Sequence, residues 1–289
     1  MTFTFFTLGG KQLWEDLFFY QGWRIQRNCL TRKYRLLDSW DIRRESGSLL
    51  RCQNAFIHYI DVYQLLRPKQ KAVIFLHGLG RTKDMFDAMA QNFTKEGFTA
   101  IAINYPSLCK SFDTIVNQME FLLKNLKDIQ EVNFIAHGLG GLILRKLLNK
   151  NGSWRRKIKT NRIVAIDVPN RGWKAGEILS RNKIAVQAIP VLRIYESYFI
   201  GELPDFPKNL DIGILTTWNP FIRLFTNILP AAWRRLFLNA KDSHINSAKE
   251  IFAAKYLRLN QCASQKIITH CINFIKYGKF QLPQKIKKL

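Results

Sequence analysis

The chain has 289 residues, of which 47% are hydrophobic and 23% are charged. This composition is that of an ordinary globular protein and excludes a disordered, collagen-like or coiled-coil chain, and the length predicts one large domain or two small ones. The unusual property is the charge, because 45 Lys and Arg residues against 21 Asp and Glu residues give a formal net charge of +24. Such a charge bears on partners rather than on the fold, and it indicates nucleic acid, an anionic membrane surface or an acidic protein.

The five cysteines include no C-x-x-C pair, so neither a disulfide framework nor a zinc module is indicated. We expect reduced, buried thiols in a cytoplasmic protein that uses no cofactor and no metal. The apolar start of the chain, residues 1–8, is too short for a signal peptide or a membrane span, and no apolar run of about 18 residues occurs. Any membrane association is therefore expected to be peripheral.

The first 70 residues are predicted to form a helical extension, residues 1–70, that packs on a main domain of residues 71–289. Helices are predicted over Gln12–Tyr20 and Arg51–Leu66. The first of them has an apolar stripe made of Leu13, Trp14, Leu17 and Phe18. A separate domain is not expected, since a segment of about 70 residues makes only a marginal core by itself.

From Lys71 onward, short apolar runs that predict buried strands alternate with amphipathic segments that predict helices. The predicted strands are Lys71–His77, Phe98–Asn104, Val132–Ala136, Arg162–Val168 and Asp211–Thr216. The predicted helices are Asp84–Lys95, a helix capped by Ser111 that ends near Leu126, a helix that ends near Asn149, and Ser264–Tyr277. This alternation predicts an α/β fold with a mostly parallel sheet and helices on both faces.

The most informative segment is Phe134–Arg145, FIAHGLGGLILR, where a turn of small residues joins a predicted strand to a predicted helix. This is the context of the G-x-S-x-G nucleophile elbow. Small residues are needed two positions before and two positions after the nucleophile, because the turn is sharp and the strand and helix pass close together. Here those positions are Ala136 and Gly140, and the nucleophile position is Gly138.

Residues from Lys71 to the C-terminus resemble bacterial lipase- and esterase-like members of the α/β-hydrolase fold family. The resemblance rests on the glycine motifs FLHGLG and HGLGG and on VPNRG after the next predicted strand. The segment Gly22–Asp38 is also similar to the N-terminal extension of a proteobacterial subgroup, so the resemblance covers nearly the whole chain. These motifs are specific for the fold and weak for the substrate.

The resemblance implies an oxyanion loop that begins at His77 and Gly78. The backbone N–H groups of Leu79 and Leu139 would then form the oxyanion hole, with His137 beside the elbow. Such a pocket would bind an acyl group, a carboxylate or another anion. The competing interpretation is that the two glycine motifs now form only tight turns.

The resemblance also implies a catalytic triad in the order Ser, then Asp or Glu, then His. Gly138 stands at the first position, and Asp242, in NAKDSHINSAK, is the candidate acid. The base would lie in the loop before the last helix, residues 257–263, which contains no histidine. Because Gly138 has no side chain to acylate, we predict that Gly138→Ser destabilises the fold modestly and restores no ester hydrolysis.

The expected function is therefore that of a catalytically inactive, lipase- or esterase-like protein that binds an acyl or anionic small molecule, an anionic membrane surface or an acidic protein. The alternative is an active carboxylic-ester or acyl hydrolase, or a non-hydrolytic enzyme of the same superfamily, with a rearranged site. His137 as a general base and Cys262 as a displaced nucleophile are weaker possibilities, and Ser107 is interpreted as a turn residue.

The basic segments are the last clue to partners. The stretch near residues 218–238 interleaves apolar side chains with arginines and is interpreted as a cap-like helical insertion that would also suit an anionic bilayer. Arg155–Lys159 and Lys285–Lys288 are basic clusters that we expect to be solvated surface. Nucleic acid is the least favoured partner, because the sequence has no motif of aromatic platforms or a reading helix.

Overall fold

The computed structural model describes residues 10–218, 240–255 and 260–281. A six-stranded parallel sheet lies at its centre, in the order β10-β9-β8-β7-β5-β6. Its strands are β5 (Lys71–Leu76), β6 (Thr99–Ile103), β7 (Glu131–His137), β8 (Lys159–Ile166), β9 (Asp211–Trp218) and β10 (Glu250–Lys255). The five predicted strands are confirmed, although β8 begins three residues earlier than predicted and ends two residues earlier. The edge strand β10 was not predicted, and its alternating exposure explains why it lacks the continuous apolar run of its neighbours.

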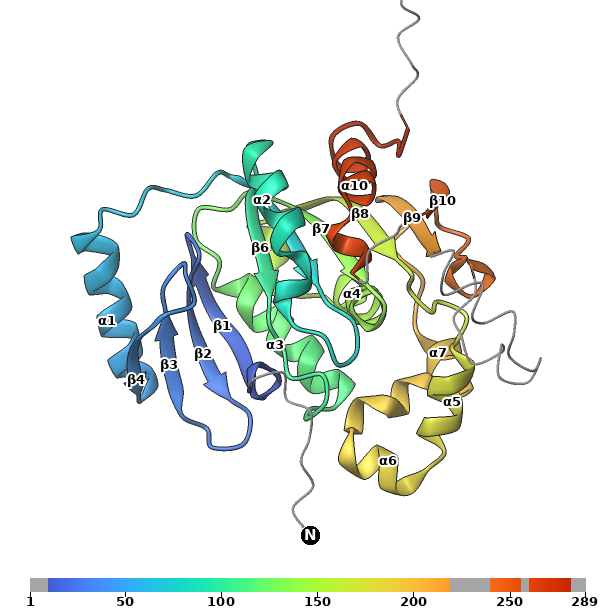
Figure 1. Cartoon of the computed structure of the whole chain (residues 1–289), viewed down its shortest axis with the longest axis horizontal. Helices are drawn as coiled ribbons and strands as arrows, with labels where there is room; N and C mark the ends of the chain where they lie inside the picture. Colours follow the sequence, from blue (N-terminus) through green and yellow to red (C-terminus); the bar gives the residue numbers. More distant parts are fainter. Residues whose placement is uncertain (1–9, 219–239, 256–259, 282–289) are drawn as a thin grey trace, which may run out of the picture.

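Helices cover both faces of this sheet, as predicted (Figure 1). The short helix η2 (Lys83–Phe86), α2 (Asp87–Lys95) and α10 (Gln265–Tyr277) pack on one face, where Phe75, Phe93 and Phe274 share a buried cluster. On the other face, α3 (Phe112–Lys124) and α4 (Leu139–Asn149) pack against Ile74. The strands are buried from two sides, which explains their uniformly apolar sequences.

The link between β8 and β9 forms a group of short helices at one end of the molecule (Figure 1). These are α5 (Lys174–Ser180), α6 (Lys183–Ala188), η4 (Pro190–Tyr195) and α7 (Ser197–Glu202), which we call the β8–β9 helices. The cap-like insertion predicted near residues 218–238 lies outside the described residues, apart from Trp218 at the end of β9. None of the described helices is long and apolar enough to cross a membrane.

The helix predicted over Gln12–Tyr20 is wrong. After a short helix, η1 (Lys11–Leu13), the chain forms an antiparallel sheet of β1 (Trp14–Tyr20), β2 (Trp23–Asn28), β3 (Tyr34–Leu37) and β4 (Arg43–Gly47). Gln21 and Gly22 connect β1 to β2 with φ values of 49° and 85°, which is the two-residue hairpin that matches the twist of the strands. The helix predicted over Arg51–Leu66 is confirmed as α1 (Leu49–Val62), which begins and ends slightly earlier and is capped by Ser48.

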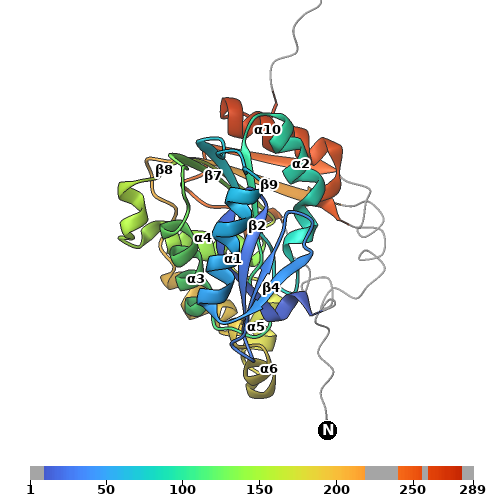
Figure 2. The ribbon, with the colours of Figure 1, turned by 90° about the vertical axis from the view of Figure 1, so that its left-hand side faces the viewer.

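This N-terminal sheet lies between α1 and the main domain, and Figure 2 shows α1 in front of it. Its attachment combines apolar contacts, such as Phe18 against Phe121 on α3, with a buried polar network. The carboxylate of Asp16 on β1 accepts hydrogen bonds from Arg24 Nη1 (2.8 Å), from Gln26 Nε2 (2.7 Å) and from the backbone N–H of Asn104 (2.7 Å), which follows β6. Asp16 and Arg24 are 1% and 6% exposed, so this buried network joins the N-terminal sheet to the end of β6.

Candidate functional site

The turn between β7 and α4 has the geometry of a nucleophile elbow. Gly138 has φ 54° and ψ −119° and donates its backbone N–H to the carbonyl of Ile166 on β8 (3.0 Å). A Cβ atom at Gly140 would lie 2.4 Å from the carbonyl oxygen of Leu76, and one at Gly141 would lie 2.2 Å from Val168. Strand and helix therefore pass so close that only glycine fits at positions 140 and 141, while the positive φ favours glycine at position 138.

Gly138 faces the loop that follows β5. A Cβ atom built on Gly138 would lie 3.6 Å from the Cα atom of Gly78, so a side chain at this position would point toward that loop. Leu139 is the first residue of α4, and the backbone N–H groups of Leu79 and Leu139 donate to no acceptor within the described residues. A helix N-terminus with a free N–H is a suitable place for a negatively charged oxygen.

The side chain of His77 stabilises the loop that follows β5. Its side chain is fully buried, its ring stacks on Tyr105 with 3.8 Å between the ring centroids, and its Nδ1 donates to the carbonyl of Gly78 (2.9 Å). Burial lowers the pKa of His77 to about 4, so the ring is neutral at neutral pH. Ser107 contributes from the other side, because its Oγ accepts from the backbone N–H of Gly80 (3.0 Å). Both side chains therefore hold the loop in place through hydrogen bonds to Gly78 and Gly80.

Gln261 occupies the loop before α10, where the triad order places the base. It belongs to a short helix, η6 (Gln261–Ala263), and its Nε2 lies 2.6 Å from Nε2 of His137 and 3.1 Å from Oδ2 of Asp167. Asp167 follows β8 and is held by Thr217, whose backbone N–H donates to Oδ1 (2.7 Å) and whose hydroxyl donates to Oδ2. A chain of hydrogen bonds thus runs from Thr217 through Asp167 and Gln261 to His137, the neighbour of Gly138.

Asp242, the candidate acid from the sequence, lies elsewhere in the site region. Its backbone oxygen accepts from the N–H of Arg171 (2.9 Å), and the residue lines a hollow of about 710 Å³ beside the β8–β9 helices, together with Trp173. The carboxylate that bonds the residue at the base position is Asp167. The role of Asp242 as the acid stays a prediction, and Asp167 is a second candidate for that position. The sequence signal for Asp167 is its position at the carboxyl end of the strand that follows the elbow, because ligands bind at that edge of a parallel sheet.

Burial shifts the pKa values of two titratable residues in the site, Asp167 and His137. Burial raises the pKa of Asp167 to about 6, although hydrogen bonds from Thr217 and Gln261 oppose the rise. Burial, and then the positive charge of Arg81, lower the pKa of His137 to about 4. His137 is therefore neutral at neutral pH. A ring nitrogen with so low a pKa is a poor general base there, which argues against His137 as the base.

The amide of Gln261 has two N–H hydrogens, one for Asp167 and one for Nε2 of His137. This assignment of the amide and of the His137 tautomer follows from the hydrogen-bond network. An amide cannot take up a proton at neutral pH, so Gln261 cannot do the work of a triad histidine. Cys262 beside it is fully buried, and burial raises the pKa of its thiol well above the usual value, so it supplies no thiolate. In the described part of the chain, no cluster of side chains suits a metal ion.

Comparisons with known proteins agree with this geometry. The family model described as alpha/beta hydrolase fold matches residues 71–178. The lipase BlEst2 from Bacillus licheniformis is similar in its mature form (TM-score 0.55, 15% identity, 73% of this chain and 91% of that chain) and in its propeptide form (TM-score 0.52, 14% identity, 73% and 50%). No curated protein matches the sequence.

The parallel sheet, the strand–turn–helix at Gly138 and these matches define the class: the chain has the α/β-hydrolase fold and is similar in structure to lipases. At 14–15% identity the similarity to BlEst2 shows the fold alone.

Proposed function

We propose that this protein is a lipase- and esterase-like pseudo-hydrolase, which keeps the binding geometry of the fold but does not hydrolyse its ligand. The observation that carries the proposal is Gly138, which stands at the elbow with φ 54° and ψ −119° and offers no atom that could form an acyl bond. The amide of Gln261 at the base position supports it independently, because an amide does not take up a proton at neutral pH.

The size of the expected loss follows from serine proteases. Removal of the nucleophile or the base there lowers turnover by about 10⁶-fold, and the oxyanion hole and binding alone leave about 10³–10⁴-fold over water. The N–H groups of Leu79 and Leu139 are the part of that machinery that this site retains. They would donate hydrogen bonds to a carbonyl or carboxylate oxygen, so the proposed ligand is an acyl compound or a carboxylate.

Chemical labelling and restoration of the triad test the missing chemistry. We expect a fluorophosphonate probe to leave the wild-type protein unlabelled and p-nitrophenyl butyrate to remain intact. Gly138→Ser alone should also be inactive for lack of a base. The double variant Gly138→Ser with Gln261→His should hydrolyse the ester faster than either single variant, since Asp167 would accept the N–H of the new imidazole.

Ser107→Ala serves as the control, because Ser107 is the buried serine beside the loop that follows β5. Labelling of the wild-type protein at any serine would overturn the proposal. Ester hydrolysis by the wild-type protein that is lost in Asp167→Asn would establish the alternative of an active hydrolase. Equal rates in the two single variants and the double variant would show that Gln261 is not at the base position.

Ligand binding is tested with a matched pair of small molecules. Decanoate and decanol share the alkyl chain, but only decanoate carries a carboxylate for the two N–H groups. We expect decanoate, and not decanol, to raise the melting temperature of the wild-type protein. A protein whose melting temperature responds to neither compound would contradict the acyl-binding part of the proposal.

A further inference from the structure

A hollow of about 460 Å³ lies at the amino ends of β7 and β8. Its wall contains four cationic side chains, Arg155, Arg156, Lys157 and Lys159, with the side-chain amides of Gln130 and Asn209 beside them. We call it the cationic hollow. The backbone holds its two sides together, because the N–H of Lys159 donates to the carbonyl of Gln130 (2.8 Å).

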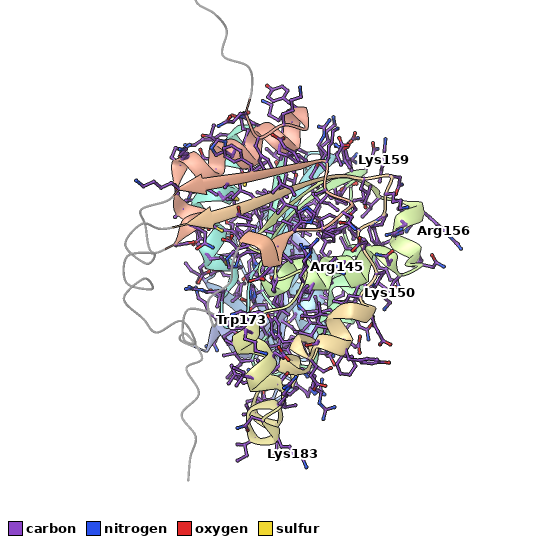
Figure 3. All side chains as sticks on the ribbon, turned by 90° about the vertical axis from the view of Figure 1, so that its right-hand side faces the viewer. Arg145, Lys150, Arg156, Lys159, Trp173 and Lys183 are labelled. Atoms are coloured by element: carbon purple, nitrogen blue, oxygen red, sulfur yellow. The ribbon has the colours of Figure 1, made fainter. Side chains whose placement is uncertain are left out.

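The cationic hollow lies away from the elbow. Gly138 follows the carboxyl end of β7, whereas Gln130 precedes the amino end of the same strand. Figure 3 shows Arg156 and Lys159 on one side of the molecule, while the arrows of the nearest strands point to the other side. A ligand in the cationic hollow would therefore not touch Gly138, and the inference does not depend on the proposed function.

Charge distinguishes this hollow from two others on the surface. A hollow of about 540 Å³ contains Asp113 and Glu202 as well as lysines, and the hollow beside Asp242 contains Glu177 and Asp205 as well as arginines. The cationic hollow is lined by no carboxylate. Within the part of the chain that the structure describes, none of its four cationic side chains makes a hydrogen bond or an ion pair.

One of these cations is partly positioned in advance. The guanidinium carbon of Arg155 lies 5.5 Å from the ring centroid of Trp154, and Trp154 is 1% exposed. The guanidinium thus rests on a buried aromatic side chain, which limits its freedom before any ligand arrives. The other three side chains are exposed and would otherwise only repel one another across the hollow.

We propose that the cationic hollow is a binding site for phosphate groups. A phosphate monoester or diphosphate carries close to two negative charges near neutral pH, and its oxygens accept bidentate hydrogen bonds from arginine. Two arginines, two lysines and two amides around a concave surface suit such a multiply charged, oxygen-rich group better than a single carboxylate. The phosphate could belong to a soluble diphosphate or to a phospholipid headgroup, and the experiment separates these two sources.

The experiment compares the wild-type protein with two double variants of equal charge. Arg156→Ala with Lys159→Ala removes two cations of the hollow. Lys183→Ala with Lys266→Ala removes two exposed lysines on α6 and α10, outside the hollow. Binding of pyrophosphate is measured by calorimetry, and binding to vesicles of phosphatidylcholine with and without phosphatidic acid, whose headgroup is a phosphate monoester, is measured by flotation.

We expect the wild-type protein and the Lys183/Lys266 variant to bind at least one of the two phosphate probes. The Arg156/Lys159 variant should bind it about tenfold more weakly or worse, as the loss of two charge-assisted contacts implies. The charge-conserving variant Arg156→Lys with Lys159→Arg should retain binding, which separates lost charge from misfolding. Binding of pyrophosphate alone would identify a soluble source, and binding of phosphatidic acid vesicles alone would identify a headgroup.

Two outcomes would overturn the proposal. In one, the wild-type protein binds neither pyrophosphate nor the anionic vesicles. In the other, the Lys183/Lys266 variant loses as much affinity as the Arg156/Lys159 variant, so that the net charge of +24 and not the hollow accounts for binding.

Discussion

Asp167 shows how hydrogen bonds hold a carboxyl group in the candidate site. Its backbone has φ 46°, a left-handed conformation that costs a residue with a side chain free energy, of the order of 1–3 kcal/mol. The compensation is visible in its partners, because both carboxylate oxygens accept hydrogen bonds from Thr217 and Oδ2 accepts a further one from Gln261. Burial raises the pKa of Asp167 to about 6 against the effect of these hydrogen bonds, and this shift links the residue to the stability of the fold.

The pH dependence of unfolding tests this link. Because the pKa of Asp167 is about 6 in the folded protein and 3.8 ordinarily, the folded state binds this proton more tightly than the unfolded state. Its contribution to stability is complete below pH 3.8 and is lost as the pH rises through about 6. At 1.36 kcal/mol per pKa unit the loss is about 3 kcal/mol at most. The Asp167→Asn variant should not show this loss of stability when its urea unfolding is measured between pH 3.8 and pH values above 6.

His77 and His137 act in the opposite direction over the same range, because their lowered pKa values favour the folded state at higher pH. They are present in both proteins, so the difference between the wild-type protein and Asp167→Asn isolates the carboxyl group. Asp113→Asn, which changes a carboxyl group that is 72% exposed, is the matched control. Parallel stability curves for the wild-type protein and Asp167→Asn would contradict the raised pKa.

The sequence identified the elbow residues because their signal is local: a strand, a glycine-rich turn and a helix within twelve residues, Phe134–Arg145. Asp167 and Gln261 carry no such signal. They are 94 positions apart, and only the register of β8 and the path of the loop before α10 bring them together. Asp167 was also assigned to the strand Arg162–Val168, whereas its left-handed backbone ends β8 at Ile166. Gln261 lies in the loop where the sequence predicts the base, but an amide cannot act as a base and so gives no signal of a site residue.

Among the structural elements, β5 and α4 approach each other very closely at Gly140. The Cβ atom that alanine would add at Gly140 lies 2.4 Å from the backbone oxygen of Leu76, which cannot move unless the strand and helix separate. Gly140→Ala should therefore lower the free energy of unfolding by about 3 kcal/mol or more, or prevent folding. Urea unfolding and the yield of soluble protein measure this.

Gly201→Ala provides the comparison for that substitution. Gly201 lies in α7, and a Cβ atom there would meet nothing within 4 Å. Alanine at this helical position should raise stability by about 0.5–1 kcal/mol, because glycine loses more backbone entropy on folding. If Gly140→Ala unfolded at the same urea concentration as the wild-type protein, the close approach of β5 and α4 would be wrong.

The two sheets differ in how well the sequence predicts them, for a physical reason. Strands of the parallel sheet are covered on both faces, so each is a continuous apolar run between turn residues. Strand β1 instead mixes buried polar residues, Glu15 and Asp16, with apolar ones, and its apolar spacing also fits a helical stripe. The sequence feature that indicates a hairpin is the Gln21–Gly22 turn, which is not part of the apolar periodicity.

At the level of the whole molecule, the buried pair of Arg24 and Asp16 connects the N-terminal sheet to the main domain. Arg24→Met keeps most of the side-chain volume but leaves the Asp16 carboxylate without its cation. It should lower the free energy of unfolding by about 3–5 kcal/mol, the usual cost of breaking a buried ion pair on one side. Adding Asp16→Asn should recover part of this loss, because the unpaired charge is then gone.

Lys276→Met is the control for this pair, since it breaks the more exposed ion pair with Glu96 and should cost less than about 1 kcal/mol. Urea unfolding of the three variants and of the wild-type protein gives the comparison. Equal losses for Arg24→Met and Lys276→Met would mean that the network at Asp16 does not hold the N-terminal sheet to β6.

The hydrogen-bond partners of Asp16 are synthesised at different times. Arg24 and Gln26 lie on the next strand of the same hairpin, so they become available as soon as that hairpin has left the ribosome. Asn104 follows nearly ninety residues later along the growing chain. The hairpins β1 to β4 close only short loops, which is fast. The N-terminal sheet can thus form on the nascent chain while water occupies the acceptor position of Asp16 that later binds Asn104. The end of β6, once synthesised, can then dock onto this preformed sheet.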